Sequence, residues 1–243
     1  GDEQIVRRVI RAVELRRDVM AGLGVHVTDD NASVATGARR VMIAVKPQVF
    51  DTIGEAVERI DGRGQCVISI MAGIPIRRLA GAVGEDAARL IRVMPNTPLL
   101  AGAGMSAIAA GSGATRDDVA WVERLLGAAG WTVVVDESLM DAVTAVSGSG
   151  PAYVFYLAEA MAEAGRKLGL TEDQADLLTR RTIAGAAKLL AESEDSPGEL
   201  RRRVTSPGGT TQAACEHLDS RDARDIIIQA IAKAAARSQE LAG

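Results

Sequence analysis

The sequence predicts a doubly wound α/β domain with a mainly parallel sheet, followed by an all-helical domain. The first half alternates short apolar runs with amphipathic segments, an order typical of parallel strands covered by helices on both faces. Two of these runs, Val41–Val45 and Val67–Ile70, are almost continuously apolar, as strands buried on both faces are. From about Ser138 onward strand patterns give way to helical periodicity. We therefore expect an α/β domain over 1–137 and a helical domain over 138–243.

The individual elements follow from the same patterns. Strands are expected at Val25–Thr28, Arg40–Val45, Cys66–Met71, Leu90–Met94, Met105–Ala109 and Trp131–Asp136. Helices are expected between them at Pro47–Ile60, Ile76–Ala82 and Arg116–Ala129. In the second half they are expected at Ser138–Ala145, Pro151–Leu168, Thr171–Ser193, Gly198–Arg203, Gly208–Ser220 and Arg221–Leu241. Thr171-Glu-Asp-Gln predicts a capping box, and the Ala-rich helical half predicts burial against a second copy of the chain.

Composition excludes several classes of partner. The 243 residues have a net charge of −4, which disfavours nucleic acid because phosphate neutralisation requires a basic surface. Aromatic residues make up only 2%, so bases are not expected to stack on rings. No apolar run reaches membrane-spanning length and no signal-peptide pattern occurs, so we expect a cytoplasmic protein. The two cysteines and two histidines lack ligand-like spacing and predict neither a disulfide framework nor a metal site.

Two segments of glycine and hydroxyl residues, Ala145–Tyr153 and Val204–Thr211, each precede a long helical pattern. A helix start leaves backbone N–H groups without partners, and the helix dipole adds partial positive charge there. Together the two segments predict seats for an anion and for the polar edge of a small ligand. The alternative is a pair of ordinary helix starts, capped by Ser149 or Ser206, with Pro151 at the first helical position.

Three turns follow predicted strands, at the sheet edge where ligands of open α/β folds bind. They are Ala44-Val-Lys-Pro-Gln48, Met71-Ala-Gly-Ile-Pro75 and Met94-Pro-Asn-Thr-Pro98. Their small residues would let a flat ring or a phosphate lie against the backbone. The plainer interpretation is that they are tight connections, which Pro and Gly favour.

The motif that should precede these turns is missing. A dinucleotide-binding fold opens with a strand, G-x-G-x-x-G and a helix, and this sequence contains no such motif. Residues 1–20 instead contain an arginine-rich stretch, which we interpret mainly as a solvated helix face: Arg7, Arg8, Arg11, Arg16 and Arg17. A sheet without its first strand would expose apolar edges, so we favour a first strand–loop–helix unit that was removed from or lies outside this sequence. The alternative is a variant that never had it.

Four segments, in their order and spacing, resemble the pyrroline-5-carboxylate reductase family. They are Ala44–Gln48, Met94–Pro98, Asp141–Tyr153 and Val204–Thr211, within a resemblance that covers Gly22–Gly243. The resemblance implies reduction of 1-pyrroline-5-carboxylate to L-proline by NADPH or NADH, the last step of proline synthesis. It also implies a Rossmann domain, a helical domain that interlocks two subunits into a homodimer, and a larger ring of dimers.

The resemblance also assigns individual residues. It implies cofactor contacts at Asn31, Ala44, Val45, Lys46, Pro47, Ala72 and Glu137, to which we add Asn96 and Pro151 from the neighbouring motifs. It implies substrate contacts at Glu194, Ser206, Gly208, Gly209, Thr210 and Thr211. At one position where the family often has an asparagine that contacts the cofactor, this chain has Arg203, so that contact is not carried over.

The implied substrate is a cyclic imine that bears a carboxylate. Its protonated form accepts hydride at carbon without a metal or a covalent intermediate. We hypothesise that Thr211 hydrogen-bonds the ring nitrogen and is therefore catalytic. The loop Ser206–Thr210 would receive the carboxylate on backbone N–H groups.

Two other functions stay open. One is a related dehydrogenase of β-hydroxy acids, which would need a catalytic lysine such as Lys167, Lys188 or Lys233 in the helical half. The other is a truncated or non-catalytic protein that binds a nucleotide or serves as a scaffold.

Overall fold

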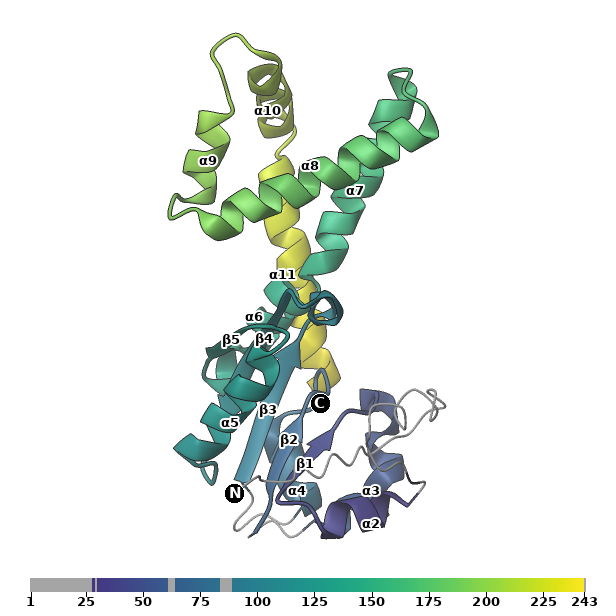
Figure 1. Cartoon of the computed structure of the whole chain (residues 1–243), viewed down its shortest axis with the longest axis vertical. Helices are drawn as coiled ribbons and strands as arrows, with labels where there is room; N and C mark the ends of the chain where they lie inside the picture. The colour runs from purple at the N-terminus through teal and green to yellow at the C-terminus, as the bar shows by residue number, and fades with distance from the viewer. Residues whose placement is uncertain (1–27, 29, 61–63, 84–88, 243) are drawn as a thin grey trace. The chain divides into compact units, whose positions relative to one another are not determined.

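The sheet has the order β1-β2-β3-β4-β5 in the computed structural model, which describes residues 28, 30–60, 64–83 and 89–242. These described strands are β1 (Arg40–Ile43), β2 (Cys66–Ser69), β3 (Arg89–Pro95), β4 (Gly104–Ala110) and β5 (Gly130–Val134). Neighbouring strands are parallel except β3 and β4, whose connection is too short for a crossover. The expected mainly parallel sheet is confirmed (Figure 1).

Helices pack on both faces of the sheet. They are α2 (Asn31–Thr36), the 3₁₀-helix η1 (Pro47–Ile53), α3 (Gly54–Glu58), α4 (Ile76–Val83), the 3₁₀-helix η2 (Thr97–Ala101) and α5 (Arg116–Gly127). Val67 of β2 belongs to a core cluster that also contains Val34 of α2 and Leu79 of α4. The next residue, Ile68, belongs to a second cluster with Val122 of α5. Successive side chains of one strand thus enter opposite cores, and the doubly wound architecture is confirmed.

Three expectations for this region need comment. The expected strand Val25–Thr28 falls outside the described residues except for Thr28, which lies in no strand. The expected helix Pro47–Ile60 divides into η1 and α3, and the Thr52 hydroxyl donates to the Val49 carbonyl at 2.6 Å, competing with the regular helix pattern. The short helix α2 was not expected, although Asp30 caps it by accepting from the Ser33 amide at 3.1 Å.

The chain divides into two compact units, which we call the sheet unit and the helical unit. The sheet unit comprises the described residues of Gly1–Ser149 and Lys233–Gly243, and the helical unit is Gly150–Ala232. The expected boundary between residues 137 and 138 is earlier than this division, and the sequence pattern did not indicate that the C-terminal residues join the sheet unit. Within the sheet unit, the Ser238 hydroxyl donates to the Asp141 carboxylate at 2.7 Å.

The helical unit is built from α7 (Gly150–Lys167), α8 (Glu172–Glu192), α9 (Pro197–Arg203), α10 (Thr210–Ser220) and the first half of α11 (Ala223–Ala242). The capping box at Thr171 is confirmed, because the Thr171 hydroxyl accepts from the Gln174 amide and the Gln174 side chain accepts from the Thr171 amide. Gly165 of α7 lies so close to Ala175 of α8 that an added Cβ would sit 3.2 Å from the Cβ of Ala175.

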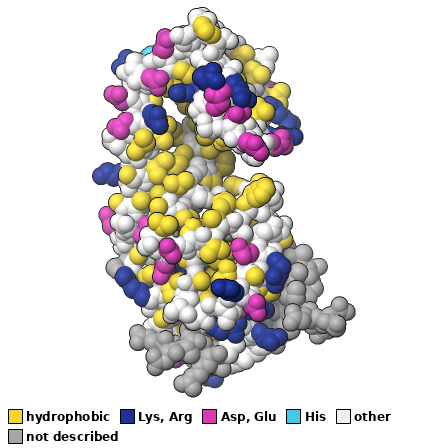
Figure 2. Space-filling view, turned by 90° about the vertical axis from the view of Figure 1, so that its left-hand side faces the viewer, with side chains coloured by type: hydrophobic (Ala, Val, Ile, Leu, Met, Phe, Trp, Pro, Cys, Tyr) yellow, Lys and Arg dark blue, Asp and Glu magenta, His cyan; other side chains and the backbone are white. Residues whose placement is uncertain are grey.

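The helical unit buries very little by itself. Of residues 150–232, all of which the structure describes, only Ala175 and Thr179 are buried. Large apolar side chains are exposed along its helices: Val154, Phe155, Tyr156, Leu157, Leu177, Leu178, Leu189, Leu190, Ile226, Ile227 and Ile228. Exposed apolar side chains are also abundant on the face of the molecule shown in Figure 2. No helix in the described part of the chain is long and apolar enough to cross a membrane.

Candidate functional site

The structure brings the three turns of the predicted cofactor site to one edge of the sheet. β1, β2 and β3 are neighbouring parallel strands, so their carboxyl ends lie together, and ligands of open α/β sheets bind at such an edge. Ala44–Pro47 follow β1, Ala72 follows β2, and Asn96 follows β3. Ala44 and Lys46 are exposed, whereas the Val45 side chain is buried. In the turn after β2, Ala72 is half-buried, whereas Gly73, Ile74 and Pro75 are buried.

Asn31 also belongs to the sheet unit. It is the first residue of α2, directly after the capping residue Asp30, and it is half-buried. The Asp30 amide donates to the Thr28 hydroxyl at 3.1 Å, so this helix start is held by local contacts.

Glu137 joins two elements of the sheet unit. It begins the short 3₁₀-helix η3 (Glu137–Leu139), and its Oε1 accepts from the Ile76 amide, at the start of α4, at 2.6 Å. The same oxygen lies 3.3 Å from Nη1 of Arg92, which is only 6% exposed. A carboxylate at a helix N-terminus is stabilised by the helix dipole. Arg92 was missed by the sequence prediction, although a charged residue inside the apolar strand Leu90–Met94 was a signal.

Asn96 uses both ends of its side-chain amide within the sheet unit. Its Oδ1 accepts from the Met105 amide at 2.9 Å. Its Nδ2 donates to the Ser147 carbonyl at 3.3 Å and lies 3.4 Å from the Ser147 hydroxyl. Asn96 therefore connects the turn after β3 to the first of the two glycine and hydroxyl segments.

The first segment leads into α7 at Gly150, one residue before the predicted start, but it forms a π turn rather than an open junction. The chain runs from α6 (Met140–Val143) into a π-helical turn, η4 (Thr144–Gly148), and the Ser149 amide donates to the Thr144 carbonyl at 2.8 Å. The expectation of an unpaired amide here is wrong for Ser149. The Thr144 hydroxyl donates back to the Met140 carbonyl at 2.8 Å, which competes with the α-helical pattern. Single π turns inside helices occur frequently at functional sites.

Gly148 leaves room for the Met94 side chain beside this turn. A Cβ added there would lie 2.4 Å from Cε of Met94, on β3, so a larger residue would push the methionine away. The absence of a side chain at Gly148 therefore lets the Met94 side chain pack against the backbone of the turn.

The second glycine and hydroxyl segment lies in the helical unit and leads into α10. Gly208 has a φ of +70°, and the Gly209 amide donates to the Ser206 carbonyl at 3.0 Å. The N-cap is Gly209 rather than the expected Ser206. Because Thr210 and Thr211 are the first two residues of the helix, their amides have no partner within it. Thr211 is half-buried, and its hydroxyl makes no hydrogen bond to any of the described residues.

Gln212 is a residue of this loop that the sequence prediction missed. Its Oε1 accepts from the Gly208 amide at 2.6 Å, and its Nε2 donates to Glu216 at 2.7 Å. A glutamine at the third helical position is typical of a capping box, so its position after Gly209 was a usable signal. The Gly208 amide is consequently occupied by the chain itself.

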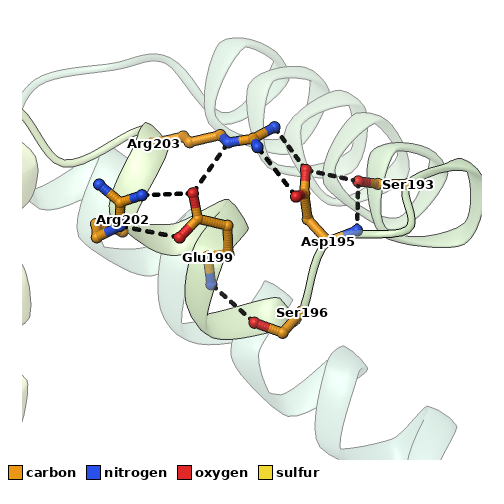
Figure 3. Close-up of polar contacts among 6 residues, drawn as sticks. All are labelled: Ser193, Asp195, Ser196, Glu199, Arg202 and Arg203. Atoms are coloured by element: carbon orange, nitrogen blue, oxygen red, sulfur yellow. Dashed lines mark hydrogen bonds and ion pairs between the residues drawn. The ribbon is translucent and has the colours of Figure 1, made fainter.

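The remaining predicted residues also lie in the helical unit. Glu194 is exposed in the connection between α8 and α9, and Pro151 is the second residue of α7. Arg203 does not extend freely from its position at the end of α9 but contacts Asp195 and Glu199 (Figure 3). The cofactor residues from Asn31 to Glu137 thus belong to the sheet unit, and the substrate residues belong to the helical unit.

The lysines of the alternative dehydrogenase do not form a polar site. Lys167 and Lys188 are in exposed ion pairs with Glu163 and Glu192 on their own helices. Lys233 is exposed on α11. Among the described residues there is also no group of three His, Cys, Asp or Glu side chains that could hold a metal ion.

Comparison with known proteins points to one family. Residues 137–241 match the family described as pyrroline-5-carboxylate reductase dimerisation. The pyrroline-5-carboxylate reductase of Synechocystis is 43% identical over 217 residues, which cover 89% of this chain and 80% of the relative. The enzyme of the same name from Arabidopsis thaliana is 40% identical over 226 residues, covering 93% and 81% respectively.

Solved structures agree with these relatives. A pyrroline-5-carboxylate reductase from Coxiella burnetii superposes with a TM-score of 0.85 at 38% identity, over 91% of this chain and 83% of that one. The pyrroline carboxylate reductase of Plasmodium falciparum, solved with NADP bound, has a TM-score of 0.81 at 28% identity and covers 90% and 83%.

Proposed function

The chain belongs to the pyrroline-5-carboxylate reductase family, and on that premise we propose that it reduces 1-pyrroline-5-carboxylate to L-proline with hydride from NAD(P)H. This is the last step of proline biosynthesis. The observation that carries the proposal is the identity of 43% to a reductase of that name over 89% of the chain. The structure supports it with a sheet edge suited to a dinucleotide and a helix start suited to a carboxylate.

The cofactor site that we propose is the edge formed by the turns after β1, β2 and β3. The small exposed residue Ala44 and the half-buried Ala72 leave room against the backbone, which fits a dinucleotide. Asn31, Ala44, Val45, Lys46, Pro47, Ala72, Asn96, Glu137 and Pro151 are the residues that we assign to it. When bound, the reduced nicotinamide supplies the hydride.

Two of these residues would act mainly by positioning their neighbours. The Asn96 side chain is already bonded to Met105 and Ser147, so we assign it the task of holding the π turn at the sheet edge. Glu137 Oε1 is bonded to the Ile76 amide, so it fixes the start of α4 beside the turn that carries Ala72. Val45 would contribute its backbone, because its side chain is buried.

The substrate site that we propose is the loop from Ser206 to Thr211 together with Glu194. The amides of Thr210 and Thr211 would receive the substrate carboxylate, since Gly208 and Gly209 already donate to Gln212 and Ser206. The Thr211 hydroxyl would donate to the ring nitrogen and relay a proton to it from solvent. The C=N bond then becomes a C–N single bond, with hydride added at carbon and a proton added at nitrogen. Orientation by these groups is the main contribution of the protein.

We further propose that the working form is a homodimer assembled through the helical unit. Val154, Phe155, Tyr156 and Leu157 are consecutive on α7 and all exposed, so they surround the helix with apolar surface. A helix that is apolar all round is normally buried on every side. A second copy would cover this surface, which agrees with the match of residues 137–241 to a dimerisation family. A ring of dimers, the larger assembly that the resemblance implies, would bury more of the same surface.

The proposed compartment is the cytoplasm. Both cysteines, Cys66 and Cys215, are free thiols, and burial raises the pKa of the Cys66 thiol to about 12. A thiol with so high a pKa is unreactive. Free, unpaired cysteines fit a reducing environment.

An assay of proline formation tests the proposed function directly. The purified chain should oxidise NADPH or NADH when 1-pyrroline-5-carboxylate is added, and L-proline should appear in equal amount. A β-hydroxy acid supplied with the oxidised cofactor should give no reduction, which separates the related dehydrogenase. Absence of proline with both cofactors, together with absence of NADPH binding in dialysis, would favour the non-catalytic alternative.

A further inference from the structure

The polar side chains around the connection between α8 and α9 form a closed network (Figure 3). Nη1 of Arg203 lies 2.5 Å from Oδ2 of Asp195, and Nη2 donates to Oδ1 at 3.0 Å. Nε of the same guanidinium donates to Oε1 of Glu199 at 3.2 Å. A two-point contact between guanidinium and carboxylate fixes direction as well as distance. We call Asp195, Glu199 and Arg203 the α9 clamp.

The α9 clamp holds the backbone on both sides of Glu194. Ser193 is the C-cap of α8, and its hydroxyl donates to Oδ2 of Asp195 at 3.1 Å. The Asp195 amide donates back to the Ser193 hydroxyl oxygen at 3.1 Å. On the other side, the Ser196 hydroxyl accepts from the Glu199 amide at 3.2 Å and caps α9. The backbone at Glu194 is therefore held on both sides by the hydrogen bonds of its neighbours.

The α9 clamp also fixes the point where the substrate loop begins. Arg203 is the last residue of α9, and the Thr205 amide after it donates to the Arg202 carbonyl at 3.1 Å. The Thr205 hydroxyl donates to the Arg201 carbonyl at 2.7 Å. Ser206 follows directly, and its carbonyl accepts from Gly209. Asp195 is thus joined to the last residue of α9, and the turn that follows is bonded back to the last residues of that helix.

We propose that Arg203 is a positioning residue of the substrate site, which joins the Glu194 connection to the Ser206–Thr211 loop through Asp195. The proposal rests on the proposed function of these two segments. The guanidinium is turned toward carboxylates of its own chain, although the family resemblance places a cofactor contact at this position. The Asp195 and Glu199 side chains are only 28% and 29% exposed, so solvent screens their charges less than it screens a pair at the open surface.

Steady-state kinetics of four variants tests this role. Arg203→Met and Asp195→Asn should each raise the KM for 1-pyrroline-5-carboxylate about 5- to 20-fold, with kcat and the KM for NADPH changed less than about twofold. The double variant should be no worse than the worse single variant, because both changes remove the same contact. Arg203→Lys keeps one contact with Asp195 and should restore a large part of the affinity.

Arg180→Met is the matched control. Arg180 pairs with Asp176 at 2.7 Å on α8, and its side chain is 75% exposed, so it is an arginine–aspartate pair outside the α9 clamp. Its loss should leave both KM values unchanged. If Arg203→Met instead raises the KM for NADPH and leaves that for the imine unchanged, Arg203 contacts the cofactor and the proposal is wrong.

Hydrogen–deuterium exchange supplies a readout that does not depend on activity. Peptides that contain Asp195, Thr205 and Gly209 should exchange at least about tenfold faster in Arg203→Met than in the unchanged protein, while peptides of α7 should not change. Equal exchange in the two proteins would overturn the proposal even if the unchanged protein forms no proline. Absence of proline together with faster exchange would instead reject the proposed function and retain the clamp as a structural connection.

Discussion

The sheet unit and the helical unit differ in how much apolar surface each buries by itself. In the sheet unit Ile43, Ile68 and Ile91 are at most 1% exposed, and helices cover both faces of the sheet. In the helical unit Phe155 is 62% and Tyr156 76% exposed. Burial of apolar area stabilises a fold by about 25 cal/mol per Å². The sheet unit therefore contains the source of its own stability, whereas the helical unit leaves apolar surface exposed, which we propose that a second copy covers.

Because of this difference, we expect folding and assembly to respond to different substitutions. A change inside the sheet unit should lower the free energy of unfolding at any protein concentration. A change on the helices should act through association, so its effect should depend on concentration.

The largest effect is expected from Asp118→Ala in the sheet unit. The Asp118 side chain is fully buried, and it accepts from Nε of Arg89 at 2.8 Å and from the Thr115 hydroxyl at 2.7 Å. Its removal would leave Arg89 without its partner and break a capping box, so unfolding in urea should show a loss of about 3–5 kcal/mol. Asp117→Ala, an exposed neighbour, should change stability by less than about 0.5 kcal/mol. Equal losses in the two variants would contradict this prediction.

The same carboxylate predicts a dependence on pH. The side-chain hydrogen bonds from Arg89 hold the pKa of Asp118 well below its usual range. Its contribution should be complete above the unfolded value of about 3.9 and disappear as pH falls below it toward the folded pKa. The stability difference between the unchanged protein and Asp118→Asn should therefore stay constant down to about pH 4 and shrink as the pH falls from about 4 toward about 2. A difference that stays constant over this range would exclude this cause.

On the helical unit, Phe155→Glu should weaken association. A charge placed on this apolar surface must be desolvated on assembly, so we expect the dissociation constant of the dimer to rise at least about 100-fold, or about 2.7 kcal/mol. Light scattering over a dilution series measures it. Leu100→Glu is the matched control, because Leu100 is 90% exposed but belongs to the sheet unit. Dissociation in both variants would remove the distinction between the units.

Thr211→Ala tests the chemistry assigned to the helical unit. Loss of one polar contact in the transition state should lower kcat about 10- to 1000-fold, while the melting temperature stays nearly unchanged. Thr211→Ser keeps the hydroxyl and should retain most of the activity. Full turnover by Thr211→Ala would show that the hydroxyl has no catalytic role.

The smallest effect is expected from Asn96→Ala in the sheet unit. It removes neutral hydrogen bonds to Met105 and Ser147, so kcat/KM should fall about 3- to 10-fold, corresponding to about 1 kcal/mol. Asn96→Asp keeps the acceptor for Met105 and loses the donor to Ser147, which separates the two contacts. A kcat/KM within the error of the unchanged protein would show that the π turn does not need this support.

The sequence predicted the elements that depend on local patterns. Buried strands such as β2 have continuous apolar runs, and the capping box at Thr171 depends on residues within one helical turn. The π turn could not be predicted in this way, because it depends on a close approach of Gly148 to Met94 and on Asn96, which is distant in sequence. The same holds for the Arg92–Glu137 pair. For the candidate site, motif resemblance supplied most of the proposed residues. Gln212 was missed despite its local capping signal, whereas the partners of Arg203 emerged only from their contacts.

The C-terminal end of α11 has a consequence for handling this protein. Gly73, in the turn after β2, has a φ of +74°, and a Cβ added there would lie 3.3 Å from Cβ of Leu241. An affinity tag fused to the last residue, or a truncation that removes Leu241, would therefore alter the packing beside the turn after β2, where we propose that the cofactor binds. Purification handles and reporter fusions belong elsewhere in the chain, and activity measured with a C-terminal tag should be compared with that of the tag-free protein.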